Sequence, residues 1–510
     1  MALNPLPAHL LILDIDGLRQ DVFHRALAEG HEGHEGHAPN LARLLGGADA
    51  GCGLHLDPLS PAPSITFAAQ TTIFTGLPPG QHGIAGNEFF DRFGLHNGGK
   101  PRFYAFDVGD ALAVDDAVEV FTGPVGLVGK TLAPEVPTLY ELAAAHGLTS
   151  LVVYNMIARG ATHWIRPNLL DIARFTRGGG LLGIRAEQYD TRMLDDLIQR
   201  LRRAAFPDIV TAYFMGLDHH SHQHGPGAQL DYLARVVDPQ IGRLVGELEG
   251  GDRLSNLLAV VVSDHGQIGV IPDDRHSQRL GFPFDREMGH VFDALGLDVH
   301  DYPGEGPDCN ALVACNGGLA YVYLRRRQAG WGETPSFVED VQRVASAFWR
   351  ANQTGAYDPD LQDAMAMILV RDCEQSGWQA PYQVFAPEGR QQGYPEGHPQ
   401  ELLPLGEYLA SHPEIETAEA VARLESLAGP MTGDILLVSN YAGGFYFGAP
   451  ITGIHGGLHP QESRAVLSLG WQGAGPEQVA ALRHAAHAVV GQRPSSLADL
   501  VPLLKIVYGW

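Results

Sequence analysis

Short apolar runs rich in Val, Ile and Leu recur along this chain and alternate with helical patterns. The runs cover residues 10–15, 150–154, 209–214, 257–262, 434–438 and 465–469. Runs this short and this continuously apolar are typical of strands that are buried on both faces. Helical patterns lie between them, at residues 138–145, 187–204, 229–248, 337–351 and 476–490. The alternation predicts an α/β fold with a mainly parallel central sheet flanked by helices.

Three of the apolar runs are followed closely by an aspartate. Asp16 follows the run at 10–15, Asp218 the run at 209–214, and Asp264 the run at 257–262. In open α/β sheets, functional residues gather beyond the carboxyl ends of the strands. We therefore expect these three carboxylates to share one site.

The stretch from residue 295 to residue 430 has a different composition. It is rich in Pro, Gly, Gln and Glu and has fewer long apolar runs. We interpret it as an inserted cap. The catalytic α/β core is then formed by residues 1–294 and resumes with residues 431–510.

Composition and charge limit the possible functions. Of the 510 residues, 45% are hydrophobic and 18% charged, which is typical of a globular protein with a large core. The formal net charge is −25, and this argues against tracking along nucleic acid and against docking on anionic membranes. A phosphate-processing enzyme is compatible with this acidity because bound cations reverse the local charge.

The cysteines and the N-terminus indicate a cytoplasmic protein. None of the four cysteines forms a CxxC pair, so neither a thiolate zinc site nor a redox motif is predicted. A disulfide between Cys309 and Cys315 is an alternative that we do not favour. Residues 1–10 carry no basic segment or cleavage site, and the apolar run that follows is too short to span a bilayer.

Three histidines accompany the three aspartates. His222 lies four residues after Asp218, a spacing that places both on one face of a helix. His265 directly follows Asp264, so the two side chains can share an ion only if the strand has ended. His455 lies in a Gly-rich turn. Three Asp and three His are enough ligands for two divalent metal ions.

Alternatives to this ligand set remain open. Asp16 could be the N-cap of a helix rather than a ligand. The other possible ligands are Asp14, His219, His220, His224 and His459.

Thr66 is a candidate nucleophile at the start of a predicted helix over residues 66–75. Pro63 precedes this segment and Gly76 ends it, as expected for a helix. A helix N-terminus offers free N–H groups and the positive end of a dipole to an anion. There are two alternatives. Thr66 is an ordinary helix cap, or Ser64 is the nucleophile instead.

The ordered motifs resemble the alkaline phosphatase superfamily, specifically its nucleotide pyrophosphatase/phosphodiesterase branch. They extend from Asp16 to His455 and are Asp16-Gly17 with Leu18-Arg19, Thr66-Phe67, Thr75-Gly76-Leu77-Pro78 to His82-Gly83-Ile84, Asp218 with His222 and Gly225-Pro226, Ser263-Asp264-His265-Gly266, and His455-Gly456. The resemblance implies an alkaline phosphatase-like fold that holds two zinc ions in one cleft. Manganese would fit the same ligand atoms.

The resemblance also implies a role for each site residue. One ion would be held by Asp218, His222 and His455. The second would be held by Asp16, Asp264 and His265, with Thr66 as the activated nucleophile. Asn87 falls at the position where this branch has a phosphate-binding amide. Phe67 and Tyr213 fall at positions where the branch has aromatic rings that stack on a nucleotide base. Core packing is the alternative for both rings.

The sequence departs from this branch at several positions. Ala68-Ala69-Gln70-Thr71 replaces the usual Pro-Asn-His-Tyr, and Gln267 stands where Met is common. The sulfatase signature is absent, and no Arg lies near Thr66 to bind a doubly charged monoester. The predicted function is hydrolysis of a small phosphodiester or nucleotide through a phospho-threonine intermediate. The alternatives are a phosphomonoesterase, a phosphonate hydrolase, a phosphomutase and a non-catalytic binding protein, and the oligomeric state is open.

Overall fold

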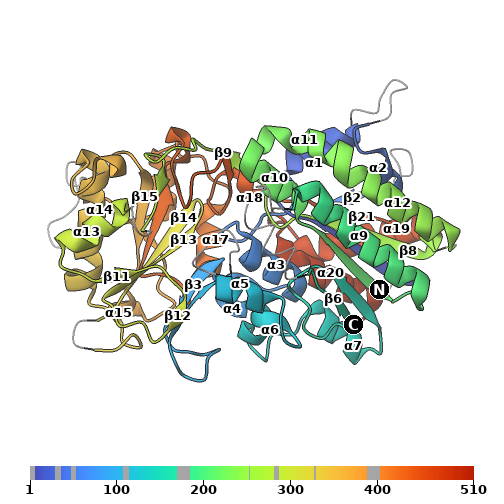
Figure 1. The fold of residues 1–510 in the computed structure, drawn as a ribbon, viewed down its shortest axis with the longest axis horizontal. Helices are drawn as coiled ribbons and strands as arrows, with labels where there is room; N and C mark the ends of the chain where they lie inside the picture. Colours follow the sequence, from blue (N-terminus) through green and yellow to red (C-terminus); the bar gives the residue numbers. More distant parts are fainter. Residues whose placement is uncertain are drawn as a thin grey trace.

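Two seven-stranded sheets form the two halves of the molecule (Figure 1). The computed structural model describes residues 6–28, 36–46, 53–106, 114–168, 184–251, 253–280, 286–326, 329–387 and 402–510. Both halves contribute residues to the candidate functional site.

The first sheet has the strand order β2-β21-β8-β1-β7-β5-β6. Its parallel strands are β1 (His9–Ile15), β5 (Ser150–Val153), β6 (His163–Ile165), β7 (Ile209–Phe214) and β8 (Leu257–Val262). At one edge of the sheet, β2 (Leu54–His55) pairs antiparallel with β21 (Leu467–Gly470), which in turn pairs antiparallel with β8. The predicted mainly parallel sheet is therefore confirmed.

Both faces of this sheet are covered by helices, which explains why its strands are continuously apolar. Alternate residues of β1 point into different cores. Leu10 and Ile12 belong to the core on one face, and Leu11 and Leu13 belong to the core on the other. The first face carries α3 (Thr66–Thr75), α7 (Leu139–Ala145), α19 (Pro476–Val490) and α20 (Leu500–Tyr508). The second carries α1 (Gln20–Ala28), α2 (Pro39–Leu44), α9 (Ala186–Arg203) and α12 (Asp238–Gly250).

The second sheet has the order β11-β13-β14-β18-β15-β16-β17 and is almost entirely antiparallel. Its strands are β11 (Val299–His300), β13 (Ala311–Asn316), β14 (Leu319–Leu324), β15 (Met365–Val370), β16 (Gln383–Phe385), β17 (Leu402–Pro404) and β18 (Ile435–Ser439). On one face it packs against α13 (Glu287–Ala294) and α14 (Arg343–Thr354).

The position of β18 corrects the predicted domain boundary. The run at 434–438 was predicted to belong to the core sheet, but β18 lies between β14 and β15 in the second sheet. The chain returns to the first sheet only at β21. An apolar run alone does not tell which of two sheets a strand joins, because both offer a buried position.

The second half has apolar cores of its own and takes up segments from the N-terminal part of the chain. Its other face packs with β3 (Glu88–Asp91) and β4 (Arg102–Ala105), which form a small sheet with β12 (Gly304–Glu305). The helices α16 (Leu405–Ser411) and α17 (Ala420–Leu427) complete this core. The region is thus a packed layer joined to the first half rather than a simple insert.

Two smaller predictions concern bonds and membranes. No disulfide joins Cys309 to Cys315. Within the described residues, no helix has both the length and the apolar character that crossing a bilayer requires.

Candidate metal centre

The six predicted ligands come together at the carboxyl edge of the first sheet. Asp16 follows β1 and Asp264 follows β8, while Asp218 lies on α10 (Gly216–His224), directly after β7. Because these three strands are parallel neighbours, their carboxyl ends meet at one edge. The side chains form two groups, and within each group one ligand atom per residue lies within 4.8 Å of the others. The groups are Asp16–Asp264–His265 and Asp218–His222–His455.

The group Asp16–Asp264–His265 is fully buried and leaves two carboxylate oxygens unpaired. Asp264 Oδ1 accepts the backbone N–H groups of Gly17 (3.1 Å) and His265 (2.9 Å), and Asp16 Oδ2 accepts the Tyr213 hydroxyl. Asp16 Oδ1 and Asp264 Oδ2 have no hydrogen-bond partner among the described residues. Strand β8 has ended at Val262, so the adjacent Asp264 and His265 can converge.

The electrostatics of this group favour a bound cation. Burial raises the pKa of Asp16 well above its usual value, and the charges of Asp264 and Asp218 raise it further. His265 Nε2 lies 3.6 Å from Asp16 Oδ1 and 3.4 Å from Asp264 Oδ2. Unpaired buried oxygens facing one ring nitrogen are the donor set that a divalent metal ion requires, so these residues fit the metal that the resemblance implies.

The group Asp218–His222–His455 has one carboxylate and two imidazoles. His222 Nε2 lies 3.0 Å from Asp218 Oδ2 and 3.2 Å from His455 Nε2. Burial acts to raise the pKa of Asp218, but the adjacent His222 and His455 outweigh it, so the pKa is below its usual value. Burial holds the pKa of His455 well below its usual value, so its imidazole is neutral and able to bind a metal.

All three histidines are oriented in the same way by backbone carbonyls. The Nδ1 atoms of His222, His265 and His455 lie 2.7 Å from Gly453 O, 3.0 Å from Gly266 O and 3.2 Å from Ser64 O, respectively. The Nε2 atoms therefore face the carboxylates. A hydrogen bond at one ring nitrogen commonly fixes the other as a metal ligand.

Gly17 allows the two groups to lie close together. Its φ is +68°, and a Cβ at this position would lie 2.5 Å from Asp218 Oδ1. Any side chain at residue 17 would therefore push Asp218 away from the site.

Thr66 lies beside the first group. It is the first residue of α3, is 9% exposed, and its Oγ1 lies 3.2 Å from His265 Nε2. The N-cap is Ile65 and no side chain caps the helix, so Thr66 is not an ordinary cap. The Ser64 hydroxyl faces elsewhere, toward Gly457 O (3.1 Å) and Arg423 (2.6 Å), which argues against the alternative nucleophile.

Asn87 places a neutral amide next to Thr66. Its Oδ1 accepts the Phe67 N–H (3.0 Å), which leaves Nδ2 without a partner in the described part of the chain. Asn316, at the end of β13, holds Asn87 in turn by accepting its backbone N–H at 2.8 Å. Asn87 Nδ2 and the Thr66 N–H are then two neutral donors at one helix N-terminus.

The two predicted stacking aromatics differ. Tyr213 has no exposed surface and its hydroxyl donates to Asp16, so the structure favours the packing alternative and corrects the predicted stacking role. Phe67 is 7% exposed and lies against Phe106, with ring centroids 5.0 Å apart. Stacking on a base stays a prediction for Phe67.

The remaining alternative ligands lie outside both groups. Asp14 is buried and uses its two oxygens to accept from Gln70 (3.1 Å) and Asn155 (2.9 Å). His459 Nε2 lies 3.4 Å from Glu416. Of the histidines on α10, His219 contacts Gln223, and His220 stacks on His224.

Several supporting residues were not assigned a role from the sequence. Gln267 donates through Nε2 to Asp218 Oδ1, and Asn316 holds Asn87. Asn316 has a local signal, because it ends an apolar run directly before Gly317-Gly318. Gln267 has none beyond its departure from the family pattern.

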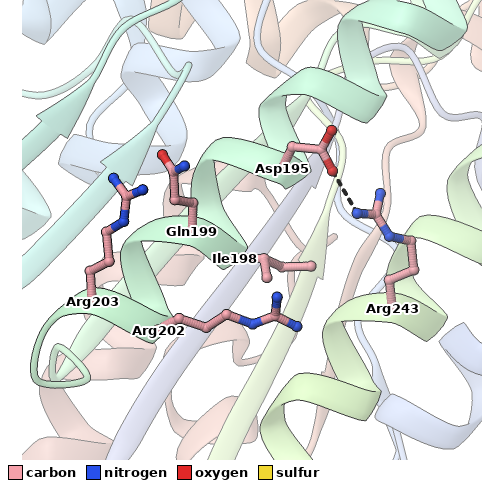
Figure 2. Close-up of a pocket in the computed structure, with 6 residues that line it drawn as sticks. All are labelled: Asp195, Ile198, Gln199, Arg202, Arg203 and Arg243. Atoms are coloured by element: carbon pink, nitrogen blue, oxygen red, sulfur yellow. Dashed lines mark hydrogen bonds and ion pairs between the residues drawn. The ribbon is translucent and has the colours of Figure 1, made fainter.

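A separate hollow of about 330 Å³ lies on the surface of α9 and α12 (Figure 2). It is lined by Asp195, Ile198, Gln199, Arg202, Arg203 and Arg243. Arg243 is ion-paired with Asp195 at 2.5 Å and Arg202 with Glu247 at 2.8 Å. None of the predicted site residues lines this hollow.

Comparisons with known proteins identify a family that this chain matches. Residues 10–347 match the profile of the type I phosphodiesterase/nucleotide pyrophosphatase family. An uncharacterized pyrophosphatase/phosphodiesterase of Schizosaccharomyces pombe is 26% identical over 267 residues, 52% of this chain and 45% of that protein. The chain thus spans about half the length of this curated relative.

Solved structures support the fold. Murine ectonucleotide pyrophosphatase/phosphodiesterase 5, in an inactive form with AMP, matches with a TM-score of 0.54 at 13% identity, covering 98% of this chain and 95% of the other. The human protein matches with a TM-score of 0.52 at 12% identity, covering 98% and 94%. The profile covers more than half of the chain and the fold is alkaline phosphatase-like. The chain therefore belongs to the type I phosphodiesterase/nucleotide pyrophosphatase family.

Proposed function

We propose that this protein hydrolyses small phosphodiesters or nucleotide pyrophosphate bonds through a phospho-Thr66 intermediate. The observation that carries the proposal is the position of the Thr66 hydroxyl, 3.2 Å from His265 Nε2 and at the N-terminus of α3. A hydroxyl beside a buried ligand group and at a helix N-terminus is equipped for phosphoryl transfer.

Two divalent ions, which we propose are zinc, would be held by Asp16–Asp264–His265 and by Asp218–His222–His455. Mixed carboxylate and imidazole ligands suit zinc, and manganese fits the same atoms. When bound, such ions lower the pKa of a nearby hydroxyl and stabilise the negative charge that develops on the reacting oxygens.

The chain's own residues perform the remaining work. Thr66 Oγ1 attacks phosphorus, and its bond to phosphorus forms as the bond to the leaving oxygen breaks. Asn87 Nδ2 and the Thr66 N–H donate to the non-bridging oxygens. Water then cleaves the bond between phosphorus and Thr66 Oγ1 and restores the free hydroxyl.

The donors next to Thr66 favour a diester. Asn87 and the backbone N–H are neutral, which suits a phosphate with one negative charge better than a doubly charged monoester. The murine structural neighbour was solved with AMP, and this supports a nucleotide as one product. Hydrolysis of monoesters or phosphonates on the same scaffold remains the second candidate.

The direct test of this proposal is Thr66→Ala. We expect turnover of bis-p-nitrophenyl phosphate to fall by at least about a thousand-fold, because the attacking oxygen is lost, while the bound metal is retained. Thr71→Ala is the matched control, since it removes another buried hydroxyl of α3 that donates only to the Phe67 carbonyl. Unchanged turnover in Thr66→Ala would exclude this nucleophile.

A substrate panel tests the choice of reaction. Initial rates on bis-p-nitrophenyl phosphate, p-nitrophenyl phosphate and a phosphonate ester should be highest for the diester. A faster rate on the monoester would favour the second candidate.

A further inference from the structure

Arg423 is a buried arginine of α17 that reaches from the second half of the molecule to the back of the candidate metal centre. The helix lies between the two halves (Figure 1). The side chain is 5% exposed. Burial lowers its pKa to about 10, so the guanidinium is still charged at neutral pH.

The guanidinium uses every N–H it has on neutral oxygens. Nε donates to Ser60 O (2.9 Å), and Nη1 to Ala418 O (3.2 Å) and Ser463 Oγ (2.6 Å). Nη2 donates to Pro61 O (2.9 Å) and Ser64 Oγ (2.6 Å), with Gly457 O at 3.4 Å. Burying a charge without a bonded carboxylate is unfavourable, so stability alone does not explain this arrangement.

The residues that Arg423 holds lead directly to the site. Ser64 lies two residues before Thr66, and its carbonyl accepts from His455 Nδ1 at 3.2 Å. Gly457 lies two residues after His455, and its N–H donates to Glu462 Oε2 at 2.9 Å. One guanidinium therefore joins the segment that carries the nucleophile to the segment that carries a metal ligand.

We infer that Arg423 is a positioning residue, which fixes Thr66 and the ring of His455 relative to each other through Ser64 and Gly457. The part that concerns Thr66 rests on the proposed function. The part that concerns His455 does not, because it depends only on the orientation of a ligand.

The test uses Arg423→Ala and Arg423→Lys in the full chain. Zinc is titrated into metal-free protein against a chromophoric chelator, and kcat and KM are measured on bis-p-nitrophenyl phosphate. We expect both variants to lose about 10–100-fold in affinity for the zinc ion held by Asp218, His222 and His455, as is common when the partner that orients a ligand is removed. We expect kcat to fall by a similar factor and KM to change little. Lysine should not restore zinc affinity or kcat, because it lacks the planar set of five donors.

Restoration of kcat by added guanidinium ion is a second measurement, and a purely structural role of Arg423 would not produce it. Added guanidinium, below the concentration that unfolds the protein, should restore part of kcat in Arg423→Ala but not in Arg423→Lys, where lysine fills the space. Sodium chloride at the same ionic strength should not.

Arg371→Ala is the matched control. Arg371 is also fully buried and donates to neutral carbonyls, those of Gly433, Trp378, Gly429 and Thr432, all within the second half. The Arg371→Ala variant should be less stable than the wild type but should keep its zinc affinity and kcat.

The outcomes separate this inference from the proposed function. Wild-type zinc affinity and kcat in Arg423→Lys would overturn the inference, and this variant decides the matter if Arg423→Ala does not fold. If Thr66→Ala keeps its turnover while Arg423→Ala loses zinc affinity, the nucleophile is wrong but the positioning of His455 stands.

Discussion

The two ligand groups differ in how far each balances its own charge. Asp16–Asp264–His265 has two carboxylates with an unpaired oxygen on each, all fully buried. Asp218–His222–His455 has one carboxylate between two imidazoles, and neither oxygen of Asp218 is left unpaired. A cation therefore relieves repulsion in the first group, whereas in the second it replaces contacts that already exist.

The largest expected effect is on metal stoichiometry. Asp264→Asn and Asp218→Asn each remove one charged ligand, so we expect each variant to lose more than about 100-fold in affinity for one of two ions. Metal analysis after gel filtration should give close to one ion per chain for either variant and two for the wild type.

The two variants should behave independently. A variant that loses both ions would show that the groups form one site, and the comparison between them would then fail. A variant that keeps both ions would exclude the mutated aspartate as a ligand.

The next effect is on the stability of the metal-free protein at neutral pH. The raised pKa of Asp16 makes its ionised form unfavourable in the fold, so its contribution is present below the unfolded pKa of about 3.9 and is lost as pH rises through the folded pKa. The lowered pKa of Asp218 has the opposite sign, and its contribution is present above about 3.9 and lost as pH falls.

Neutralising each aspartate should therefore shift stability in opposite directions. In chelator-treated protein at pH 7, we expect Asp16→Asn to raise and Asp218→Asn to lower the unfolding free energy, each by about 1–3 kcal/mol. Thermal unfolding with and without chelator measures this. Shifts of the same sign would contradict the proposed difference between the groups.

The smallest effect comes from the donors that hold each carboxylate. Tyr213→Phe removes the hydroxyl from Asp16, and Gln267→Met removes the amide from Asp218. Each should weaken zinc binding by about 10-fold at its own group only. Zinc titration against a chelator measures both, and a loss at the other group would show that the donor does not act through the carboxylate it contacts.

Much of the fold was predictable because its signals are local. The continuous apolar runs placed β1, β7 and β8, and Pro63 and Gly76 bracketed α3. The membership of β18 was not predictable, because its neighbours in the second sheet are set by pairing with β14 and β15, more than 60 residues away in sequence.

The six candidate ligands and Thr66 were found in the sequence because they belong to ordered motifs with fixed spacing, and the structure places the ligands in two compact groups. Tyr213 was predicted to stack on a base, whereas its hydroxyl donates to Asp16. An aromatic residue at the end of a strand is compatible with either a stacking ring or a core residue. Arg423 carries no motif and Asn316 only a weak local signal, and both reach the site because the second half packs against the first.

The central claim is that two cations lie beside Thr66, one in each ligand group. The most direct test is a crystal of zinc-loaded protein measured on both sides of the zinc absorption edge. We expect two anomalous peaks, one among Asp16, Asp264 and His265 and the other among Asp218, His222 and His455. A map with no peak at either group, or with zinc bound only elsewhere, would contradict it.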